Sequence, residues 1–375
     1  MKPLTNLRLL LIVIAAAMAW VIVSAEAEPP LTMETVADGL EHPWSLAFLP
    51  DGRQLVTERS GQLLVFSNSW QQRQSIEGVP ESAVRAQGGL MHVALDPDWQ
   101  DNGWIYLTQA IENEQGYATR LLRGRLSGTQ WTDNTVLFTA QTQHQRPVHY
   151  GARLAFMPDG TLLMSIGDGF DEREQAQRLS NHSGTIVRLN RDGSVPSDNP
   201  FVGHAGALPE IFSFGHRNPQ GLVVDERTGL IWSHEHGPRG GDELNLIEPG
   251  ENYGWPVATH GVDYSGARIT PFTSRPGMRD PKIDWTPSIA PAGMSLYRGT
   301  LFPGWDGDLL VATLVGRSVI RIRLNQDQIV EQRPLELPLD RRLRDVQVGP
   351  DGALYLLTDH RDGEIIRVSP AIPYH

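Results

Sequence analysis

The sequence contains no cysteine, and this absence excludes thiol catalysis, thiolate metal sites and disulfide bonds. Exported proteins of this size can bury enough apolar surface without disulfides, so the absence does not argue against export. The formal net charge of −12 argues against nucleic-acid binding, which needs clustered Lys and Arg for the phosphates. Amphipathic helical periodicity is scarce, while short alternating runs broken by turn residues are abundant. The chain is therefore expected to be a β-rich protein that does not bind nucleic acid.

The only long apolar run lies at the N-terminus and has the features of a secretory signal peptide. Basic residues precede the apolar segment Leu9–Val23 of about 15 residues, and Ala25–Ala27 forms an A-x-A cleavage pattern. A membrane-spanning helix needs roughly 20 apolar residues, so a cleaved signal peptide is favoured over an uncleaved anchor. We predict a signal peptide at residues 1–27 and a single domain at residues 28–375, exported to the periplasm or secreted.

A repeat made of an apolar strand, an Asp-containing turn and a second apolar strand occurs six times in the chain. The turns are often PDG, in which Pro restricts φ, Asp bonds its own backbone and Gly accepts a positive φ. The six copies are Ser45–Glu58, Val93–Gln109, Leu154–Gly169, Gly221–Gly237, Met294–Leu314 and Val346–Asp359. One hairpin cannot bury its apolar face alone, so neighbouring copies must pack against each other.

Six such repeats predict an all-β fold, a six-bladed β-propeller. A β-sandwich is less favoured because it has no comparable long-period repeat. The wider spacing in the middle of the chain indicates long inserted loops between the third and fifth copies. Binding residues tend to lie on loops that a rigid scaffold positions.

The loops that flank the hairpins are rich in Gln, His, Arg, Asn, Glu and Gly. They include Gln87–Gly89, His149 at the start of the third hairpin, Ser213–Leu222 and His234–Asn245. These residues could also have structural roles, because a histidine is more often a structural residue than a catalytic base. His234 and His236 could bind zinc only with a third ligand, which the sequence does not show. We interpret Arg153, close to His149, as a structural residue at the strand entrance.

Taken together, these loops predict a specific chemistry. Arg217 lies on a different repeat from Arg342 and Arg344, and the three arginines suggest a ligand with several carboxylates or other anionic oxygens. Oxygen ligands suited to a hard cation such as Ca²⁺ are offered by Gly237, Pro238, Glu243 and Tyr253. A neutral His149 beside such a site can remove a proton from a hydroxyl group. The residues thus predict an anionic cofactor, a calcium ion and a base.

Eight segments, in this order, resemble the soluble PQQ-dependent aldose sugar dehydrogenases, relatives of soluble quinoprotein glucose dehydrogenase. The segments are Gln87–Pro97, His149–Gly160, Gly184–Phe201, Ser213–Leu222, Glu235–Asn245, Asn252–Pro256, Pro287–Met294 and Arg342–Gly352. The resemblance runs across essentially the whole sequence after the predicted signal peptide. It implies a six-bladed propeller with pyrroloquinoline quinone (PQQ) lying over the axis.

The resemblance also implies roles for individual residues. His149 matches the general base, and Arg217 matches a catalytic cation beside the quinone. Cofactor contacts are implied for Gln87, Arg217, Asn218, Tyr264, Leu314, Arg342 and Arg344. Calcium positions are implied for the backbone carbonyls of Gly237 and Pro238 and for Glu243 and Tyr253.

The implied activity is oxidation of the anomeric carbon of an aldose sugar to a lactone, with the electrons passed to a separate acceptor. The protein is expected to be a monomer or a homodimer. One departure from the family is Val315, which stands where members often carry a lysine, and Arg317 could substitute for it. Two alternatives stay open: a metal-dependent lactonase-type hydrolase and a non-catalytic binding propeller. The arginine cluster disfavours the first, and Val315 is the main support for the second.

Overall fold

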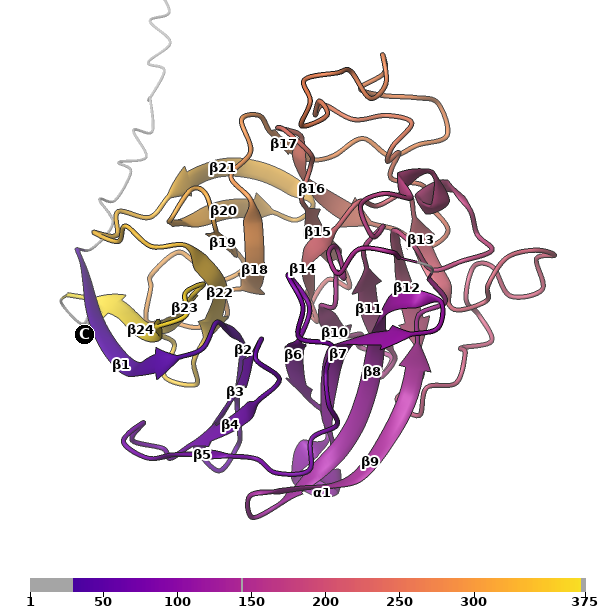
Figure 1. Cartoon of the computed structure of the whole chain (residues 1–375). Coiled ribbons are helices and arrows are strands. Elements are labelled where there is room, and N and C mark those ends of the chain that lie inside the picture. Colours follow the sequence, from indigo (N-terminus) through magenta and orange to yellow (C-terminus); the bar gives the residue numbers. More distant parts are fainter. Residues whose placement is uncertain (1–29, 143, 372–375) are drawn as a thin grey trace, which may run out of the picture.

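The computed structural model of the protein describes residues 30–142 and 144–371, and the predicted signal peptide lies outside them. Its strands form six four-stranded antiparallel sheets that follow one another around a common centre (Figure 1). The prediction of an all-β six-bladed propeller is therefore confirmed. Helical structure within the described residues is limited to the short α1 (Trp99–Asn102) and the 3₁₀ turn η1 (Arg173–Gln177). None of the helices described is long and apolar enough to cross a membrane.

The first three blades are each built from four consecutive strands. The first blade contains β2 (Pro43–Phe48), β3 (Gln54–Glu58), β4 (Leu63–Phe66) and β5 (Arg73–Ser75). The second contains β6 (Leu90–Leu95), β7 (Ile105–Asn113), β8 (Gly116–Ser127) and β9 (Gln130–Thr139). The third contains β10 (Leu154–Phe156), β11 (Leu162–Ile166), β12 (Thr185–Leu189) and β13 (Ile211–Phe214).

The last three blades follow the same order, except that the sixth takes its outer strand from the N-terminus. The fourth contains β14 (Pro219–Val224), β15 (Ile231–Glu235), β16 (Asp242–Ile247) and β17 (Ile283–Trp285). The fifth contains β18 (Pro291–Leu296), β19 (Leu309–Thr313), β20 (Val319–Asn325) and β21 (Gln328–Pro334). The sixth contains β22 (Leu343–Val348), β23 (Leu354–Thr358), β24 (Gly363–Pro370) and β1 (Leu31–Leu40).

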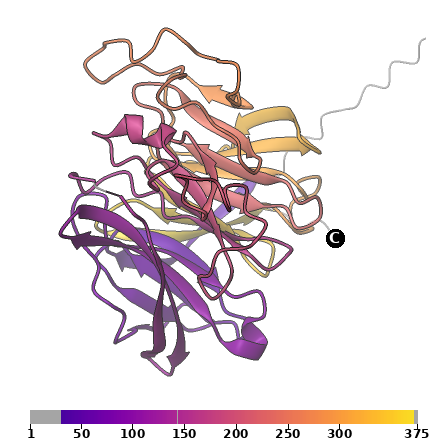
Figure 2. The ribbon, with the colours of Figure 1, turned by 90° about the vertical axis from the view of Figure 1, so that its right-hand side faces the viewer.

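The six predicted hairpins coincide with the first two strands of the six blades. The first strands, β2, β6, β10, β14, β18 and β22, contact one another in a closed ring. The loops at the ends of these strands therefore converge on the axis of the propeller. The long insertions expected in the middle of the chain link β12 to β13 and β16 to β17, and the second of these extends well away from the blades (Figures 1 and 2).

The ring is closed by β1, which pairs antiparallel with β24 from Leu31↔Pro370 to Leu40↔Gly363. Figure 1 shows this junction as an indigo strand beside a yellow one. The sequence patterns do not predict this pairing, because β1 lies outside the six hairpin repeats. Closure therefore depends on contacts between the two ends of the chain.

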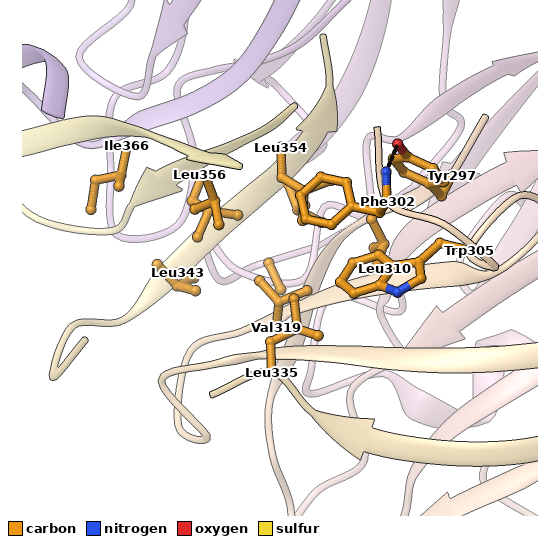
Figure 3. Packing of buried hydrophobic residues seen from close by; sticks show 13 residues of the cluster. Tyr297, Phe302, Trp305, Leu310, Val319, Leu335, Leu343, Leu354, Leu356 and Ile366 are labelled. Atoms are coloured by element: carbon orange, nitrogen blue, oxygen red, sulfur yellow. Dashed lines mark hydrogen bonds between the residues drawn. The ribbon is translucent and has the colours of Figure 1, made fainter. Parts of the chain in front are cut away.

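A hydrophobic cluster lies between each pair of neighbouring blades. Figure 3 shows the cluster between the fifth and sixth blades, where Phe302 stacks on Trp305 with ring centroids 4.5 Å apart. Leu343 and Leu356 of the sixth blade pack against the same cluster. Burial of each such side chain contributes about 1.5–3 kcal/mol, so each blade depends on its neighbours for stability.

Candidate cofactor cavity and active site

A cavity of about 270 Å³ lies at the centre of the ring and is lined by residues from all six blades. Five of the residues predicted to contact a cofactor line it, namely Gln87, Asn218, Leu314, Arg342 and Arg344. The aromatic rings of Trp44 and Tyr150 form part of its wall. The convergence of blade loops therefore places widely separated sequence segments around one small, partly apolar space.

The lining of this cavity is positively charged, because three arginines face a single carboxylate. Asp359 Oδ2 lies 3.5 Å from Arg342 Nε and 3.4 Å from Arg344 Nη2. Burial would raise the pKa of Asp359, but Arg344, Arg59 and Arg342 hold it far below its ordinary value. The carboxylate is thus ionised and neutralises only part of the positive charge, which leaves the cavity suited to an anionic ligand.

His149 lies beside the cavity on the loop between the second and third blades. Its backbone N–H donates to Gln87 Oε1 at 2.9 Å, and its Nδ1 lies 2.7 Å from Asp168 Oδ1. Asp168 also accepts hydrogen bonds from the Phe170 backbone N–H at 2.9 Å and from Trp255 Nε1 at 2.8 Å. The backbone of His149 has φ of 57°, in the left-handed region that is unfavourable for residues other than Gly. The loop is therefore held in a strained form that fixes the imidazole against Asp168.

Two opposing effects determine the ionisation of this pair. Burial lowers the pKa of His149, although Asp168 opposes the shift. Burial would raise the pKa of Asp168, but His149 and Arg217 together hold it below its ordinary value. Near neutral pH the pair therefore consists of a neutral imidazole and an ionised carboxylate. Because the carboxylate accepts the hydrogen at Nδ1, Nε2 carries the free lone pair.

Arg217 is held on the same side of the site by the turn that follows β15. Its Nη1 donates to the backbone oxygens of Gly237 at 2.6 Å and His236 at 2.9 Å. The guanidinium lies 5.3 Å from the centre of the Trp255 ring and 6.0 Å from that of Tyr264. One indole therefore contacts both the histidine–aspartate pair and this arginine.

The sequence of residues 40–367 matches the family described as Glucose / Sorbosone dehydrogenase. The chain belongs to this family. The aldose sugar dehydrogenase YliI of Escherichia coli is 38% identical over 346 residues, which are 91% of this chain and 93% of that protein. Quinoprotein glucose dehydrogenase B of Acinetobacter calcoaceticus is 27% identical, over 93% of this chain and 92% of that protein.

Solved structures support the same assignment. The apo-form of the soluble aldose sugar dehydrogenase from Escherichia coli matches with a TM-score of 0.88 at 37% identity, covering 91% of this chain and all of that one. The PQQ-bound form of the aldose sugar dehydrogenase from Streptomyces coelicolor matches with a TM-score of 0.75 at 28% identity, over 92% and 99% of the two chains. The protein is thus an oxidoreductase of the glucose/sorbosone dehydrogenase family, and the resemblance seen in the sequence is confirmed.

Not every predicted position lies at the cavity of this dehydrogenase. Tyr264 is 59% exposed and stacks on Phe170, with ring centroids 6.1 Å apart, at the outer edge of the site. Val315 is also exposed, and Arg317 pairs with Asp340 beside a neighbouring cavity. Neither Val315 nor Arg317 lines the central cavity, so neither supplies it with a cation.

The residues predicted for calcium lie in two places. At the first, the Gly237 carbonyl accepts from Arg217, while the Gly237 N–H donates to Asp242 Oδ1 at 2.8 Å. Pro238 follows directly in the same turn. A cation bound at the Gly237 oxygen would share that oxygen with the guanidinium, which uses one of its two lone pairs. This turn therefore offers main-chain oxygens to a cation, but the positive charge of Arg217 already lies beside them.

At the second place, Glu243 faces Glu235 across β15 and β16, and both carboxyl groups are buried. Burial raises the pKa of Glu243 well above its ordinary value, and Glu235 adds to the shift. The nearby Oδ1 of Asn245 is buried without a donor. Such an excess of buried oxygen acceptors suits a hard cation. The Tyr253 hydroxyl is engaged elsewhere, since it donates to the Leu246 carbonyl at 2.7 Å.

The described residues hold no group of three or more His, Cys, Asp or Glu side chains arranged for a metal ion. His236 Nε2 instead lies 2.7 Å from the Pro291 carbonyl oxygen, and His234 is buried within β15. Calcium at either place would therefore need main-chain or amide oxygens in addition to carboxylates.

Arg153 has a larger structural role than its interpretation as a strand-entrance residue implied. Its fully buried guanidinium forms an ion pair with Asp345 at 3.1 Å and donates to the backbone oxygens of Gln220 at 2.8 Å and Arg344 at 3.4 Å. It also lies 4.1 Å from the centre of the Trp44 ring. Since Trp44, Gln220 and Arg344 line the cavity, this arginine links four blades beneath it.

Sequence reasoning missed Arg59, Asp168, Trp255 and Asp359. Asp168 lies in the SIGDG stretch at the end of the third predicted hairpin, and Trp255 lies in the NYGWP segment. Both residues belong to segments that the sequence analysis identified, but no sequence pattern predicts that they lie beside His149. Arg59 follows the first hairpin and looks like an ordinary turn residue in the sequence.

Proposed function

We propose that the protein oxidises the anomeric carbon of aldose sugars to lactones with PQQ and Ca²⁺ as cofactors, and that it passes the electrons to a separate acceptor. The observation that carries this proposal is the convergence of a cationic cavity with a buried histidine–aspartate pair at the propeller axis. Membership of the sugar dehydrogenase family supports it, as does the likeness to a relative whose structure is PQQ-bound.

The residues around the cavity fit such a cofactor. PQQ is a planar, polycyclic quinone that carries several carboxylates, and guanidinium groups bind carboxylates with paired hydrogen bonds. Arg342 and Arg344 would hold these groups, while the amides of Gln87 and Asn218 offer further polar contacts. The Tyr150 hydroxyl is buried without a partner in the described structure. The cavity volume of about 270 Å³ lies just below the range of roughly 300–1,000 Å³ for small-molecule sites.

His149 is suited to act as the base in this reaction. Its Nε2 has a free lone pair, since Nδ1 is engaged by Asp168. We infer that Nε2 takes the proton of the anomeric hydroxyl while the C1 hydrogen leaves with its electron pair. When bound, PQQ supplies the two-electron acceptor for that hydride. The burial that keeps the imidazole neutral near pH 7 also keeps it ready to accept the proton.

Arg217 and calcium would stabilise the negative charge that develops as the hydride is transferred. The Gly237 carbonyl fixes the arginine, and the Gly237–Pro238 turn offers main-chain oxygens to a cation. A positioned cation stabilises developing charge more strongly in a buried site than in water. We also propose calcium at Glu243, where it would offset the repulsion from Glu235.

We further propose that the protein acts outside the cytoplasm, in the periplasm or after secretion. The basic, apolar and small-residue regions of residues 1–27 support this location. Its partners would be an aldose sugar and a separate electron acceptor.

Reconstitution tests the proposed function directly. Purified protein freed of metal and cofactor is mixed with PQQ, with and without Ca²⁺, and an aldose is then added with a dye acceptor. We expect dye reduction that requires both cofactors, with the lactone as product. Absence of PQQ binding would contradict the proposal, and binding without turnover would indicate a non-catalytic propeller.

His149→Ala tests the base assignment within the same assay. The variant should bind PQQ normally but reduce it with sugar about 10²–10⁴-fold more slowly, since that is the usual contribution of a general base. The matched control is His204→Ala, on an exposed loop of the third blade. A wild-type rate in His149→Ala would show that another group removes the proton.

A further inference from the structure

The cavity contains a third guanidinium, that of Arg59, which no sequence pattern marks. Arg59 directly follows β3 of the first blade and lines the cavity together with Arg342 and Arg344. Its position brings positive charge from the first blade to a cavity that Asn218 and Gln220 of the fourth blade also line. The first blade therefore contributes to the cavity as well as to the scaffold.

The three arginines differ in how fully the protein satisfies them. Arg344 donates to Gln220 Oε1 at 3.3 Å and to Asp359 Oδ2 at 3.4 Å, and Arg342 lies 3.5 Å from the same Asp359 oxygen. The side chain of Arg59 has no hydrogen-bond or ion-pair partner within residues 30–142 and 144–371. Its guanidinium donors are therefore available to a ligand.

The carboxylates of Glu58 and Asp359, near Arg59, are engaged by other groups. Glu58 Oε1 accepts the Glu41 backbone N–H at 2.7 Å, and its Oε2 accepts the Ser60 hydroxyl at 3.2 Å. Asp359 Oδ1 lies 3.3 Å from His42 Nδ1, while its Oδ2 serves the other two arginines. Neither of these two carboxylates is therefore free to pair with Arg59.

The backbone of Arg59 is fixed in place. Its N–H donates to the His42 carbonyl at 3.1 Å, and the preceding Glu58 N–H closes the turn on the Gln62 carbonyl at 2.8 Å. Gly89 packs so closely that a Cβ there would lie 1.9 Å from the Arg59 oxygen. This close approach explains the glycine at position 89, and it ties Arg59 to the loop that carries Gln87, a predicted cofactor contact.

The local charge also favours an anion at Arg59. Burial lowers the pKa of Arg59, Asp359 opposes this shift, and Arg344 and Arg342 lower the pKa further. Like charges at close range in a partly buried site are unfavourable unless an anion separates them. A ligand carboxylate would relieve this repulsion for all three guanidinium groups.

We propose that Arg59 binds a carboxylate of the anionic cofactor and supplies the cation that Val315, in the fifth blade, does not. This inference rests on the proposed function, because it concerns the same ligand. Arg59 would thus be a residue of the first blade that binds a polycarboxylate, at a position that no sequence pattern identifies.

The test measures PQQ binding to the apo-protein by isothermal titration calorimetry, independently of turnover. We expect Arg59→Gln to weaken binding about 10–100-fold, because charge-assisted hydrogen bonds to a carboxylate are lost. Arg59→Lys should recover part of the affinity, since it keeps the charge without the paired donors. The control is Arg53→Gln, in the same blade, whose guanidinium pairs with Asp51 near the surface and should leave affinity within twofold.

The outcomes separate this inference from the proposed function. If the wild-type protein binds PQQ and Arg59→Gln binds it equally well, the inference is wrong and the proposed function stands. If the wild-type protein does not bind PQQ, both are wrong. Should Arg59→Gln fail to fold by circular dichroism, the comparison of Arg59→Lys with wild type decides, and equal affinity there would overturn the inference.

Discussion

At the scale of single residues, the imidazole of His149 is one member of a hydrogen-bonded series that runs through Asp168 to Trp255. The histidine alone would be an ordinary weak base. The buried carboxylate selects its tautomer, and the indole N–H stabilises the charge of that carboxylate. The proton affinity of the base is therefore determined by residues from the third blade and from the loop after the fourth blade's β16.

Trp255→Phe removes only the indole N–H from this series. The carboxylate of Asp168 then loses one hydrogen bond, so its charge is less stabilised and the His149–Asp168 pair takes up a proton at higher pH. We expect the pKa of the pair to rise. The acid limb of kcat/KM should move to higher pH by the same amount, because the base must be unprotonated to act.

An NMR titration of the histidines in the apo-protein measures this shift directly, with His149→Ala used to assign the signal. The other charged or titratable groups that face the pair stay in place in the variant: His144, Asp171, Arg217 and His236. Trp305→Phe, in the cluster between the fifth and sixth blades, serves as the control for loss of an indole. An unchanged His149 titration in Trp255→Phe would contradict this account.

At the scale of elements, the start of β16 holds together two loops of different blades. The buried carboxylate of Asp242 accepts the Gly237 N–H through Oδ1, and through Oδ2 it accepts the N–H groups of Ile289 at 2.9 Å and Ala290 at 2.8 Å. Ala290 lines the cavity, and its carbonyl accepts the Leu314 N–H. One carboxylate thus positions the turn beside Arg217 and one wall of the cavity.

Asp242→Asn should lower the free energy of unfolding by about 3 kcal/mol, because the amide places a donor against backbone N–H groups and leaves them unsatisfied. PQQ affinity should fall at the same time, since the cavity wall loses its support. Urea unfolding and calorimetry measure the two effects. Asp284→Asn on β17 is the matched control, because its carboxylate is only partly buried and, within the described residues, accepts one hydrogen bond, from Thr286 Oγ1 at 3.3 Å. Equal stability of the two variants would show that Asp242 has no such role.

At the scale of the whole molecule, the stability of the propeller depends on joining the two ends of the chain. The strand β1 completes the sixth blade, and its last residue, Leu40, is fully buried in the cluster between the sixth and first blades. The cavity uses residues from all six blades, so opening the ring at this junction would also disturb the site. Closure therefore contributes to both folding and binding.

Leu40→Ala should lower the free energy of unfolding by about 2–5 kcal/mol, the usual cost of a large-to-small change in a core. Glu34→Ala, at an exposed position of the same strand, should change it by less than about 0.5 kcal/mol. Denaturant unfolding compares the two variants. A small effect of Leu40→Ala would mean that the ring stays closed without this contact.

By itself the sequence determined the repeat, the number of blades, the hairpins and a group of polar residues that includes His149, Gln87, Asn218, Arg342 and Arg344. These features follow from turn chemistry, strand alternation and recognisable segments, all of which are local. Only the tertiary structure decided which polar groups meet: Asp168 and Trp255 at His149, Asp359 and Arg59 at the cavity, and Tyr264 at its outer edge. The reason is physical, since hydrogen-bond partners, burial and ionisation at the axis depend on the convergence of six blades, and no short stretch of sequence encodes that convergence.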